Sequence, residues 1–258
     1  MIDYWFPVIH GRFGEDGQLQ HLLQRTEIPY IGSDTKTSYL CYDKISGREK
    51  AKQMGMNQPQ YLFFNYPNID SDILIQKRIV QEIGLPCFIK PSETGSSIGI
   101  SRISHEQMIM PAVKAAYQYD DKIIVEKAVE HCVEYEIAFI GNKSRRFSIP
   151  GTVEYHDEFY TTQAKYGEET TKLKAAIDID QTLKTHLYAM ASQMIEQFEV
   201  KDLGRIDFLY DQQHNKLYWN EINTIPGFTQ KSMFPFLWNE EGLSFSDLLT
   251  YIIKDAYH

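Results

Sequence analysis

The stretch from 204 to 223 constrains the fold of this chain more than any other. It contains two runs rich in β-branched and aromatic residues with a polar turn cluster between them, a pattern that predicts an antiparallel hairpin. Successive side chains of a strand point to opposite faces, so Arg205 and Asp207 share a face of the first strand, and Glu221 and Asn223 share a face of the second. A register that aligns these faces would bring two carboxylates, an amide oxygen and a guanidinium to one spot.

Such a group of side chains has the chemistry of a hard-cation site beside a phosphate clamp. Mg²⁺ prefers oxygen ligands and is usually held by one or two carboxylates plus substrate phosphates, while arginine offers a planar fork to a phosphoryl group. The alternative is a half-buried hairpin whose charges only face solvent, as on many antiparallel sheets. The hairpin alone leaves both interpretations open.

Composition narrows the class of partner. The net charge of −9 argues against nucleic acid, because binding to a phosphate backbone normally requires a basic surface. The three cysteines, Cys41, Cys87 and Cys132, are far apart and form no Cys-x-x-Cys pair, which favours a reducing, cytoplasmic location over a disulfide framework or zinc site. No segment has the apolar length of a membrane span or of a secretory signal. Small-molecule substrates are therefore expected, with neither nucleic acid nor membrane as partner.

Hydrophobic periodicity predicts alternating helices and strands. In chain order, we expect a buried strand ending at Ile9, helices over 18–25, 36–54 and 73–83, strands over 85–91 and 122–126, a hairpin of 134–140 with 146–149, and helices over 180–198 and 245–256. Lys44 would lie in the middle of the second helix. The tyrosine-rich stretch 155–171 has no clear period and is expected to be a functional loop.

Several polar residues between these elements could bind a nucleotide. The small-residue loop 92–99 follows Lys90 and could lay backbone N–H groups along a polyphosphate, although it lacks the P-loop pattern. Glu126 ends a strand, and its connector could recognise an adenine edge while Glu134 accepts hydrogen bonds from ribose hydroxyls. Taken singly, a surface turn, a solvated Lys44 and two surface glutamates are the simpler interpretations. Taken together with the hairpin, they occur in the order needed to clamp a nucleotide between two β-rich lobes.

A set of motifs in one order carries a family resemblance from about Phe6 to the end of the chain. The motifs lie at 10–17 (His-Gly-Arg-Phe-Gly-Glu-Asp-Gly), 29–33, 43–44, 89–91 with 95–99, 126–127, 164–166, 204–207 and 220–229, leading into Ser232. With them the chain resembles the D-alanine-D-alanine ligases of the ATP-grasp superfamily. The resemblance implies an α/β (α+β) ATP-grasp fold in which two β-rich lobes clamp ATP. The implied domains are a truncated N-terminal α/β subdomain (1–35), a central lobe (36–125) and a C-terminal lobe with the metal site (126–258).

The resemblance also assigns residues to ligands and to chemistry. The family matches for ATP binding are Lys44 and Lys90 for the phosphates, Glu126, Lys127 and Val129 for the adenine, and Glu134 for the ribose. Asp207, Glu221 and Asn223 match the ligands of two Mg²⁺ ions, with Mn²⁺ as an alternative metal. Arg205 and the backbone N–H of Gly227 match the groups that stabilise an oxyanion, and Ser96 and Tyr166 match the residues that close over the acceptor. His10 and Glu15 match the wall of the first substrate site, and Ser232 the residue near the second carboxylate.

The activity implied is the ATP-dependent joining of two D-alanine molecules through an acyl phosphate, for peptidoglycan synthesis. The chain departs from the family pattern at its front, where a strand, a glycine-rich turn and a helix carrying a substrate-binding glutamate have no counterpart. This departure would expose a sheet edge, which favours either a partner chain or a homodimer. Two alternatives stay open: a ligase for another amino acid or carboxylic acid, and a nucleotide-binding homologue with little activity.

Overall fold

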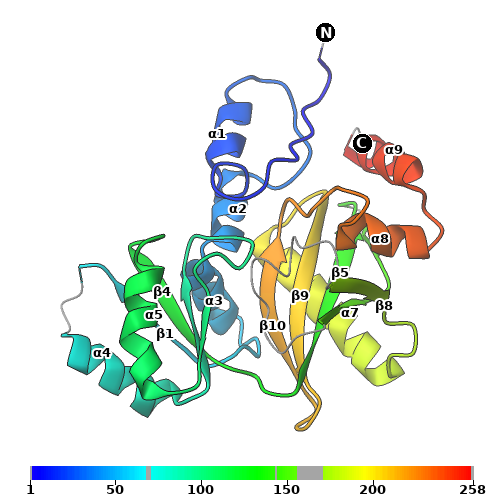
Figure 1. The fold of residues 1–258 in the computed structure, drawn as a ribbon. Helices are drawn as coiled ribbons and strands as arrows, with labels where there is room; N and C mark the ends of the chain where they lie inside the picture. The colour runs from blue at the N-terminus through cyan, green and yellow to red at the C-terminus, as the bar shows by residue number, and fades with distance from the viewer. Residues whose placement is uncertain (1, 68–70, 143, 156–170, 257–258) are drawn as a thin grey trace.

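The computed structural model describes residues 2–67, 71–142, 144–155 and 171–256. Two antiparallel sheets form the body of the protein, and the N-terminal segment with α1 (Gln18–Gln24) lies above them (Figure 1). Among the described residues, no helix combines the length and apolar character needed to span a bilayer.

The smaller sheet has the strand order β1-β4-β2-β3, and its helices cover one face. Its elements are β1 (Tyr61–Asn65), α4 (Asp72–Arg78), the π-helical turn Ile79–Ile83, β2 (Cys87–Pro91), β3 (Ser101–Ile103), the 3-10 turn Glu106–Met108, α5 (Ile109–Ala116) and β4 (Lys122–Lys127). Ile79, Ile89, Ile103, Ile109 and Ile123 are buried in the core between strands and helices. The apolar spacing that predicts a helix over 73–83 and strands over 85–91 and 122–126 is thus confirmed.

The larger sheet has the order β10-β9-β5-β7-β8, with β6 paired to β5. Its elements are β5 (Cys132–Ile140), β6 (Arg146–Phe147), β7 (Gly151–Tyr155), β8 (Thr171–Ala175), α7 (Gln181–Phe198), β9 (Leu203–Asp211), β10 (Lys216–Asn223), α8 (Met233–Glu240) and α9 (Phe245–Ala256). The predicted hairpin near 140 is confirmed, because β5 and β6 pair with Phe139 opposite Phe147. The expected loop 155–171 lies outside the described residues except at its two ends, which belong to β7 and β8.

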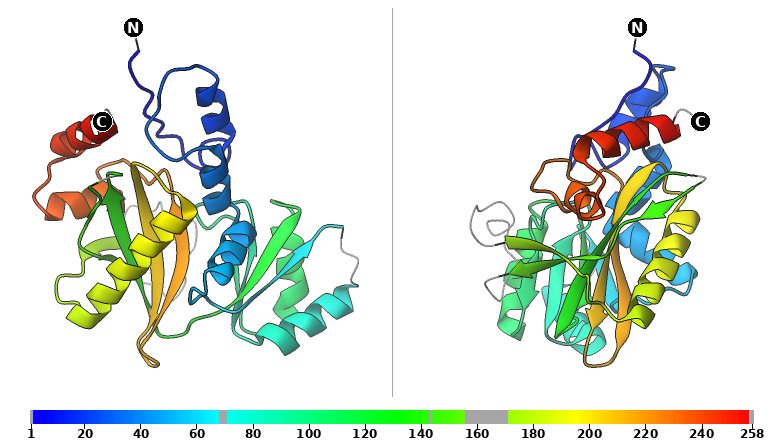
Figure 2. Two further views of the ribbon diagram at one scale, coloured as in Figure 1. Left: turned by 180° about the vertical axis from the view of Figure 1, so that it is seen from behind. Right: turned by 90° about the vertical axis from the view of Figure 1, so that its right-hand side faces the viewer.

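Helices cover both faces of the larger sheet, which explains the nearly continuous apolar run of β5. Ile137 and Phe139 join the core under α7, whereas Ala138 and Ile140 join the core under α8 and α9. Figure 2 shows α7 lying across one face of this sheet. A strand buried on both sides loses the alternation of apolar and polar residues that marks a half-exposed strand.

The predicted helix over 36–54 is wrong in one respect, because it is two helices. α2 (Thr35–Tyr42) and α3 (Lys44–Gln53) are separated at Asp43, whose backbone is extended. The Asp43 carboxylate accepts hydrogen bonds from the backbone N–H groups of Ile45 and Ser46, so it caps a new helix. Lys44 therefore opens α3 instead of lying in the middle of a longer helix.

The predicted strand ending at Ile9 is also wrong. Trp5 forms an isolated parallel bridge with Tyr30, and no ladder extends from it along the described residues. The apolar pattern of this run is real, but a strand needs a neighbour along its whole length, and only the short stretch Pro29–Ile31 accompanies it.

The domain boundaries stay a prediction, and the packing of two elements bears on them. β4 continues to Lys127 in the smaller sheet, beyond the expected boundary at 125. Ala51 of α3 is buried in the core of the larger sheet with Phe198 and Trp219, although α3 precedes the smaller sheet in the chain. α3 therefore lies between the two sheets and contacts both (Figure 1).

Candidate functional site

The hairpin of β9 and β10 has the register that the sequence requires for a site. Glu221 lies opposite Asp207, and Asn223 lies opposite Arg205. The register shifts between Trp219 and Glu221, so β10 has a bulge at this point. The expected alignment of the two polar faces is confirmed.

An ion-pair network joins this hairpin to β5. Arg205 donates to both carboxylate oxygens of Asp207, at 2.8 and 2.7 Å, and its Nε lies 2.7 Å from Glu136 Oε2. Asn223 Nδ2 donates to Asp207 Oδ2 at 3.1 Å. Burial alone would lower the pKa of Arg205, but Asp207 and Glu136 outweigh it and raise that pKa. Arg205 thus carries a fixed positive charge at the centre of the site.

The donor set suits a cation that shares its coordination shell with other oxygen ligands. Among residues 2–67, 71–142, 144–155 and 171–256, no three His, Cys, Asp or Glu side chains are grouped closely enough to hold a metal by themselves. Asp207, Glu221 and Asn223 supply two carboxylates and an amide oxygen instead. This set of oxygen ligands fits Mg²⁺, which retains waters and binds substrate phosphates alongside one or two protein carboxylates.

Basic side chains line the cavity between the two sheets, next to Glu221. The cavity is lined by Cys41, Lys44, Gly47, Arg48, Lys90, Glu126, Trp219, Asn220 and Glu221. Lys44 Nζ donates to the backbone carbonyl of Thr94 at 2.5 Å. Burial lowers the pKa of Lys44, and the negative charge of Glu221 offsets part of that effect. Lys44 and Lys90, near Glu126 and Glu221, give this cavity the kind of charge that a polyphosphate with its cation would need.

The Glu126 side chain contacts two basic residues of the cavity. Its buried carboxylate pairs with Arg48 Nε at 2.6 Å and with Lys90 Nζ at 2.5 Å. Burial alone would raise the pKa of Glu126, yet Arg48 and Lys90 hold it well below the usual range. The side chain therefore orients two basic groups. Any contact to a base would come from the backbone of the connector that follows.

That connector is held by contacts from its own lobe. Lys127 donates through its backbone N–H to the Gln60 carbonyl at 2.8 Å and through Nζ to the Leu85 carbonyl at 2.9 Å. Val129 comes next in the irregular segment before β5, and Glu134 lies opposite Leu209 in the β5-β9 ladder. Lys127 and Val129 thus lie at the link from the smaller sheet to the larger one, and Glu134 lies on the first strand after it.

The loop 92–99 is tied to the start of α3. Ser92 Oγ donates to Asp43 Oδ1 at 2.7 Å, and Lys122 Nζ donates to the other Asp43 oxygen and to Glu93. Ser96 lies farther along the loop with a positive φ of 53°. Tyr166, the other residue expected to close over the acceptor, lies outside the described residues.

The N-terminal segment lies against the loop after the β9-β10 hairpin. The Glu15 carboxylate accepts a hydrogen bond from the Gly11 N–H, and its charge interacts with Glu221. Burial raises the pKa of Glu15 to about 7, although the Gly11 N–H lowers it in part. His10 Nδ1 lies 3.1 Å from the Ile225 carbonyl in the loop after β10. His10 and Glu15 are thereby brought to one side of the site.

The loop after β10 brings Gly227 against Ser232. A Cβ at position 227 would lie 2.6 Å from Ser232 Oγ, so a larger residue here would displace the Ser232 side chain. Ser232 Oγ in turn accepts from the Thr229 N–H at 3.2 Å and immediately precedes α8. The loop is thus closed on itself beside the hairpin.

Sequence reasoning missed two charged residues of the site. Arg48 lies four residues after Lys44, which puts both side chains on one helix face, but the spacing has meaning only once α3 is known to begin at Lys44. Glu136 lies opposite Asp207 on β5. Its position two residues after Glu134, on the same face of a predicted strand, was the available signal.

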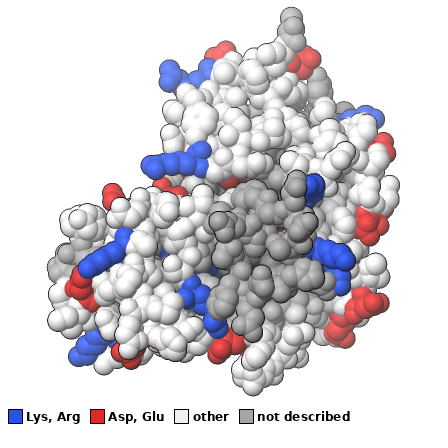
Figure 3. All heavy atoms as spheres, viewed as in Figure 1, with Lys and Arg blue, Asp and Glu red and all other residues white. Residues whose placement is uncertain are grey.

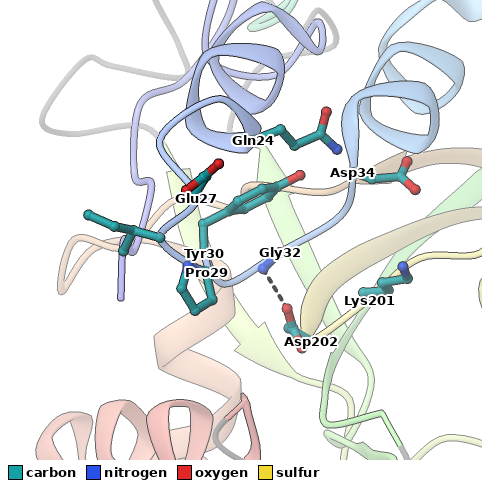
Figure 4. A pocket seen from close by; sticks show the side chains of 9 residues that line it. Gln24, Glu27, Pro29, Tyr30, Gly32, Asp34, Lys201 and Asp202 are labelled. Atoms are coloured by element: carbon teal, nitrogen blue, oxygen red, sulfur yellow. Dashed lines mark hydrogen bonds between the residues drawn. The ribbon is translucent and has the colours of Figure 1, made fainter. Parts of the chain in front are cut away.

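A larger cavity of about 580 Å³ lies elsewhere, between the N-terminal segment and the start of β9 (Figure 4). Two of its acidic residues, Asp34 and Asp202, have structural contacts. Asp202 Oδ2 accepts from the Gly32 N–H at 2.6 Å, and Asp34 caps α2 through the Thr37 N–H. On the face shown in Figure 3, Lys and Arg side chains are dispersed among Asp and Glu. Basic groups converge instead inside the cavity at Lys44, which is the better candidate for chemistry.

Comparison with known families gives a consistent result. A family model described as the D-ala D-ala ligase C-terminus matches residues 51–254, and one described as the D-ala D-ala ligase N-terminus matches residues 1–33. A D-alanine-D-alanine ligase of Thermoanaerobacter pseudethanolicus is 37% identical over 99% of this chain and 71% of its own length. A D-alanine-D-alanine ligase of Prochlorococcus marinus is 36% identical over 99% of this chain and 73% of its own.

Solved structures agree with these matches. The VanG D-Ala:D-Ser ligase from Enterococcus faecalis superposes with a TM-score of 0.88 at 31% identity, covering 99% of this chain and 73% of that one. The D-alanine-D-alanine ligase from Coxiella burnetii gives 0.85 at 28% identity, covering 98% and 67%. The expected ATP-grasp fold is confirmed. Because the family model covers residues 51–254 and the two relatives are 36–37% identical over 99% of the chain, this chain belongs to the D-alanine-D-alanine ligase family.

Proposed function

We propose that this chain is an ATP-dependent ligase that joins two D-alanine molecules into D-alanyl-D-alanine for peptidoglycan synthesis. The observation that carries the proposal is the register of β9 and β10, which sets Glu221 opposite Asp207 beside Arg205. Glu221 of this pair also lines the cavity between the sheets, together with Lys44 and Lys90. The identity of the substrate is inferred from the relatives of the chain, which are named D-alanine-D-alanine ligases.

ATP would lie in the cavity between the sheets. Lys44 and Lys90 would contact its phosphates, the connector from Glu126 through Lys127 to Val129 its adenine, and Glu134 its ribose. The contacts of Glu126 with Arg48 and Lys90 assign its carboxylate to holding the basic groups in place, so the adenine would meet backbone groups.

Asp207, Glu221 and Asn223 would hold two Mg²⁺ ions. Bound Mg²⁺ would neutralise charge on the transferring phosphoryl group. Arg205, which already pairs with Asp207 and Glu136, would fix the orientation of these carboxylates and present its remaining guanidinium edge to an oxyanion. The protein contributes chiefly by positioning charged groups before the substrates arrive.

The reaction needs two nucleophilic steps. A carboxylate oxygen of the first D-alanine attacks the γ-phosphorus of ATP and ADP leaves, giving an acyl phosphate. The amine of the second D-alanine attacks that acyl carbon, loses a proton, and expels inorganic phosphate. Arg205 and the Gly227 N–H would stabilise the tetrahedral oxyanion between addition and expulsion.

The amino-acid sites would lie beneath the N-terminal segment. His10 and Glu15 would form the wall of the first site, Ser232 would contact the second carboxylate, and Ser96 with Tyr166 would close over the acceptor. We further infer a cytoplasmic location, where ATP and the free amino acid are available. The homodimer expected from the sequence stays a prediction that light scattering would check.

The test is phosphate release from ATP with Mg²⁺, with and without millimolar D-alanine, with products separated by mass. D-alanine-stimulated release with D-alanyl-D-alanine formed supports the proposal. Because one structural relative is titled a D-Ala:D-Ser ligase, an equimolar mixture with D-serine should be assayed in parallel. A predominance of the mixed dipeptide would favour the alternative of another acceptor, and nucleotide binding without turnover would favour the low-activity homologue.

A further inference from the structure

Arg48 of α3 is a buried arginine that the proposed chemistry does not use. It is 3% exposed and lies where α3 meets both sheets. We propose that Arg48 is a positioning residue that holds the β10 bulge at Asn220 and thereby aims Glu221 at the metal site. This inference rests on the proposed function only for the identity of the reaction, and its test separates the two.

The guanidinium of Arg48 contacts both sheets. Nε donates to Glu126 of the smaller sheet at 2.6 Å. Nη1 donates to the Trp219 carbonyl of the larger sheet at 2.9 Å, and Nη2 to Asn220 Oδ1 at 3.4 Å. The guanidinium also lies 5.0 Å from the centroid of the Trp219 ring. A rigid planar fork can serve these partners at once, whereas a lysine offers a single ammonium.

The bulge changes which residues of β10 share a face. Trp219 is buried opposite Phe208 in the core under α7. In a regular strand, residues two apart share a face, so Glu221 would point into that same core. The register shift at Asn220 reverses the alternation and sets Glu221 opposite Asp207 instead. The metal site therefore depends on this one irregularity.

Contacts from α3 and the segment after it hold the bulge in place. β10 is the edge strand of the larger sheet in the described part of the chain, so no neighbouring strand pairs with its outer backbone groups there. The Trp219 N–H donates to the Asn57 carbonyl at 2.9 Å, and the Trp219 carbonyl accepts from Arg48. Both backbone groups of the residue before the bulge are thus held from outside the sheet.

Arg48 also sets the charge around Lys90. The Glu126 carboxylate forms ion pairs with both Arg48 and Lys90. Its negative charge is therefore balanced by two basic groups and not by Lys90 alone. A variant that removes the Arg48 charge would leave Lys90 as the sole basic partner among these contacts of Glu126. A variant that keeps a positive charge but loses the fork can still form an ion pair with Glu126, whereas it loses the contacts to the bulge. The two effects can therefore be separated by choice of substitution.

The experiment uses Arg48→Lys as the main variant, Arg48→Met as the more severe one and Lys52→Met as the matched control. Lys52 is one turn farther along α3 and exposed, so its loss removes the same charge without touching the bulge. Each protein is assayed for D-alanine ligation. Each is also titrated by calorimetry with AMPPNP, a non-hydrolysable ATP analogue, with and without Mg²⁺.

For Arg48→Lys we expect kcat to fall on the order of tenfold to a hundredfold with the KM for D-alanine unchanged, because a misaimed Glu221 impairs chemistry more than amino-acid binding. AMPPNP affinity without Mg²⁺ should be retained, while the gain in affinity on adding Mg²⁺ should shrink. Lys52→Met should match the wild type. Arg48→Met should also lose AMPPNP affinity without Mg²⁺, because Lys90 becomes committed to Glu126.

Wild-type kcat and an undiminished Mg²⁺ gain in Arg48→Lys would overturn the inference. A loss of affinity in Arg48→Lys that is the same with and without Mg²⁺ would overturn it too, because that result indicates a general disturbance of the cavity. If the wild type binds AMPPNP with a Mg²⁺ gain yet does not ligate D-alanine, the proposed function fails. The calorimetric comparison then still decides the role of Arg48.

Discussion

At the scale of single residues, Glu221 should separate nucleotide binding from phosphoryl transfer. Replacing Glu221 with alanine removes one of two carboxylates that face each other across β9 and β10. We expect ligation to fall on the order of a thousandfold, because the transferring phosphoryl group loses its charge compensation. Binding of AMPPNP without Mg²⁺ should persist, since the connector and lysine contacts lie on other elements. Glu240→Ala, at an exposed position of α8, is the control.

Phosphate-release kinetics and calorimetry together check this prediction. Ligation by Glu221→Ala within a few fold of the wild type would exclude Glu221 from the metal site. Loss of nucleotide binding even in the absence of Mg²⁺ would show instead that Glu221 supports the cavity as a whole.

Glu15 should make the stability of the unliganded protein depend on pH. Burial raises its pKa from 4.5 to about 7, so the folded protein favours the protonated carboxyl. A raised pKa contributes stability that is fully present below the unfolded value and lost as pH rises through the folded value. Between about pH 4.5 and 7, the wild type should therefore lose stability relative to Glu15→Gln, whose amide oxygen can still accept from the Gly11 N–H.

The check is the melting temperature at pH 5 and pH 8 for both proteins without nucleotide. Glu106→Gln, an exposed position far from Glu15 in the chain, supplies the baseline for losing a carboxylate. The decline from pH 5 to pH 8 should be smaller in Glu15→Gln than in the other two proteins. Equal declines in all three would show that Glu15 ionises as an ordinary glutamate.

At the scale of elements, the start of α3 should couple helix stability to nucleotide affinity. Asp43 caps α3, accepts a hydrogen bond from Ser92 and forms an ion pair with Lys122. These contacts fix the start of α3, where Lys44 lies, relative to the loop 92–99. We expect Asp43→Ala to destabilise the protein by about 1–2 kcal/mol or more, the usual cost of losing an N-cap. It should also raise the KM for ATP, because Lys44 and the loop lose their common anchor.

The matched control is Asp180→Ala. Asp180 caps α7 through the N–H groups of Thr182 and Leu183, on a helix that does not contribute to the cavity lining. Denaturant unfolding should show a loss of stability in both variants, whereas steady-state kinetics should show a raised KM for ATP only in Asp43→Ala. A raised KM in both would mean that general destabilisation explains the effect.

Elements with a strong local pattern could be predicted from the sequence, and elements set by distant contacts could not. The hairpin of β9 and β10 and the helix α7 follow from alternation and from three- and four-residue spacing. β1 (Tyr61–Asn65) is short and was missed, because its pairing partner β4 lies far along the chain. The break at Asp43 was missed because the surrounding residues all tolerate a helix, and the cap gains its value from Ser92 and Lys122.

The site shows the same division. Strand alternation predicts that the acidic faces of the two strands can meet, and the register, with Glu221 opposite Asp207, confirms this. The role of Glu126 could not be foreseen, since its partner Arg48 comes from a helix 78 residues earlier in the chain. The bulge at Asn220 was equally hidden, because the alternation of Trp219 and Glu221 by itself suggests a shared face.

At the scale of the whole molecule, nucleotide should join the two sheets into a more stable unit. The basic and acidic groups of the cavity come from both sheets and from α3, so a ligand there binds the folded state alone. At a hundredfold excess over Kd, such binding stabilises by about 2.7 kcal/mol. For a chain of this size each kcal/mol raises the melting temperature by about 2–4 °C. Saturating AMPPNP with Mg²⁺ should therefore raise it by roughly 5–10 °C.

AMP is the matched control ligand, because it keeps the adenine and ribose but lacks the β- and γ-phosphates that Lys44 and Lys90 would contact. At the same concentration, AMP should raise the melting temperature far less than AMPPNP. Equal shifts would mean that the lysines of the cavity contribute little and that the base supplies the affinity. Two separate melting transitions that persist with AMPPNP would mean that the ligand occupies one sheet only, and would contradict binding between them.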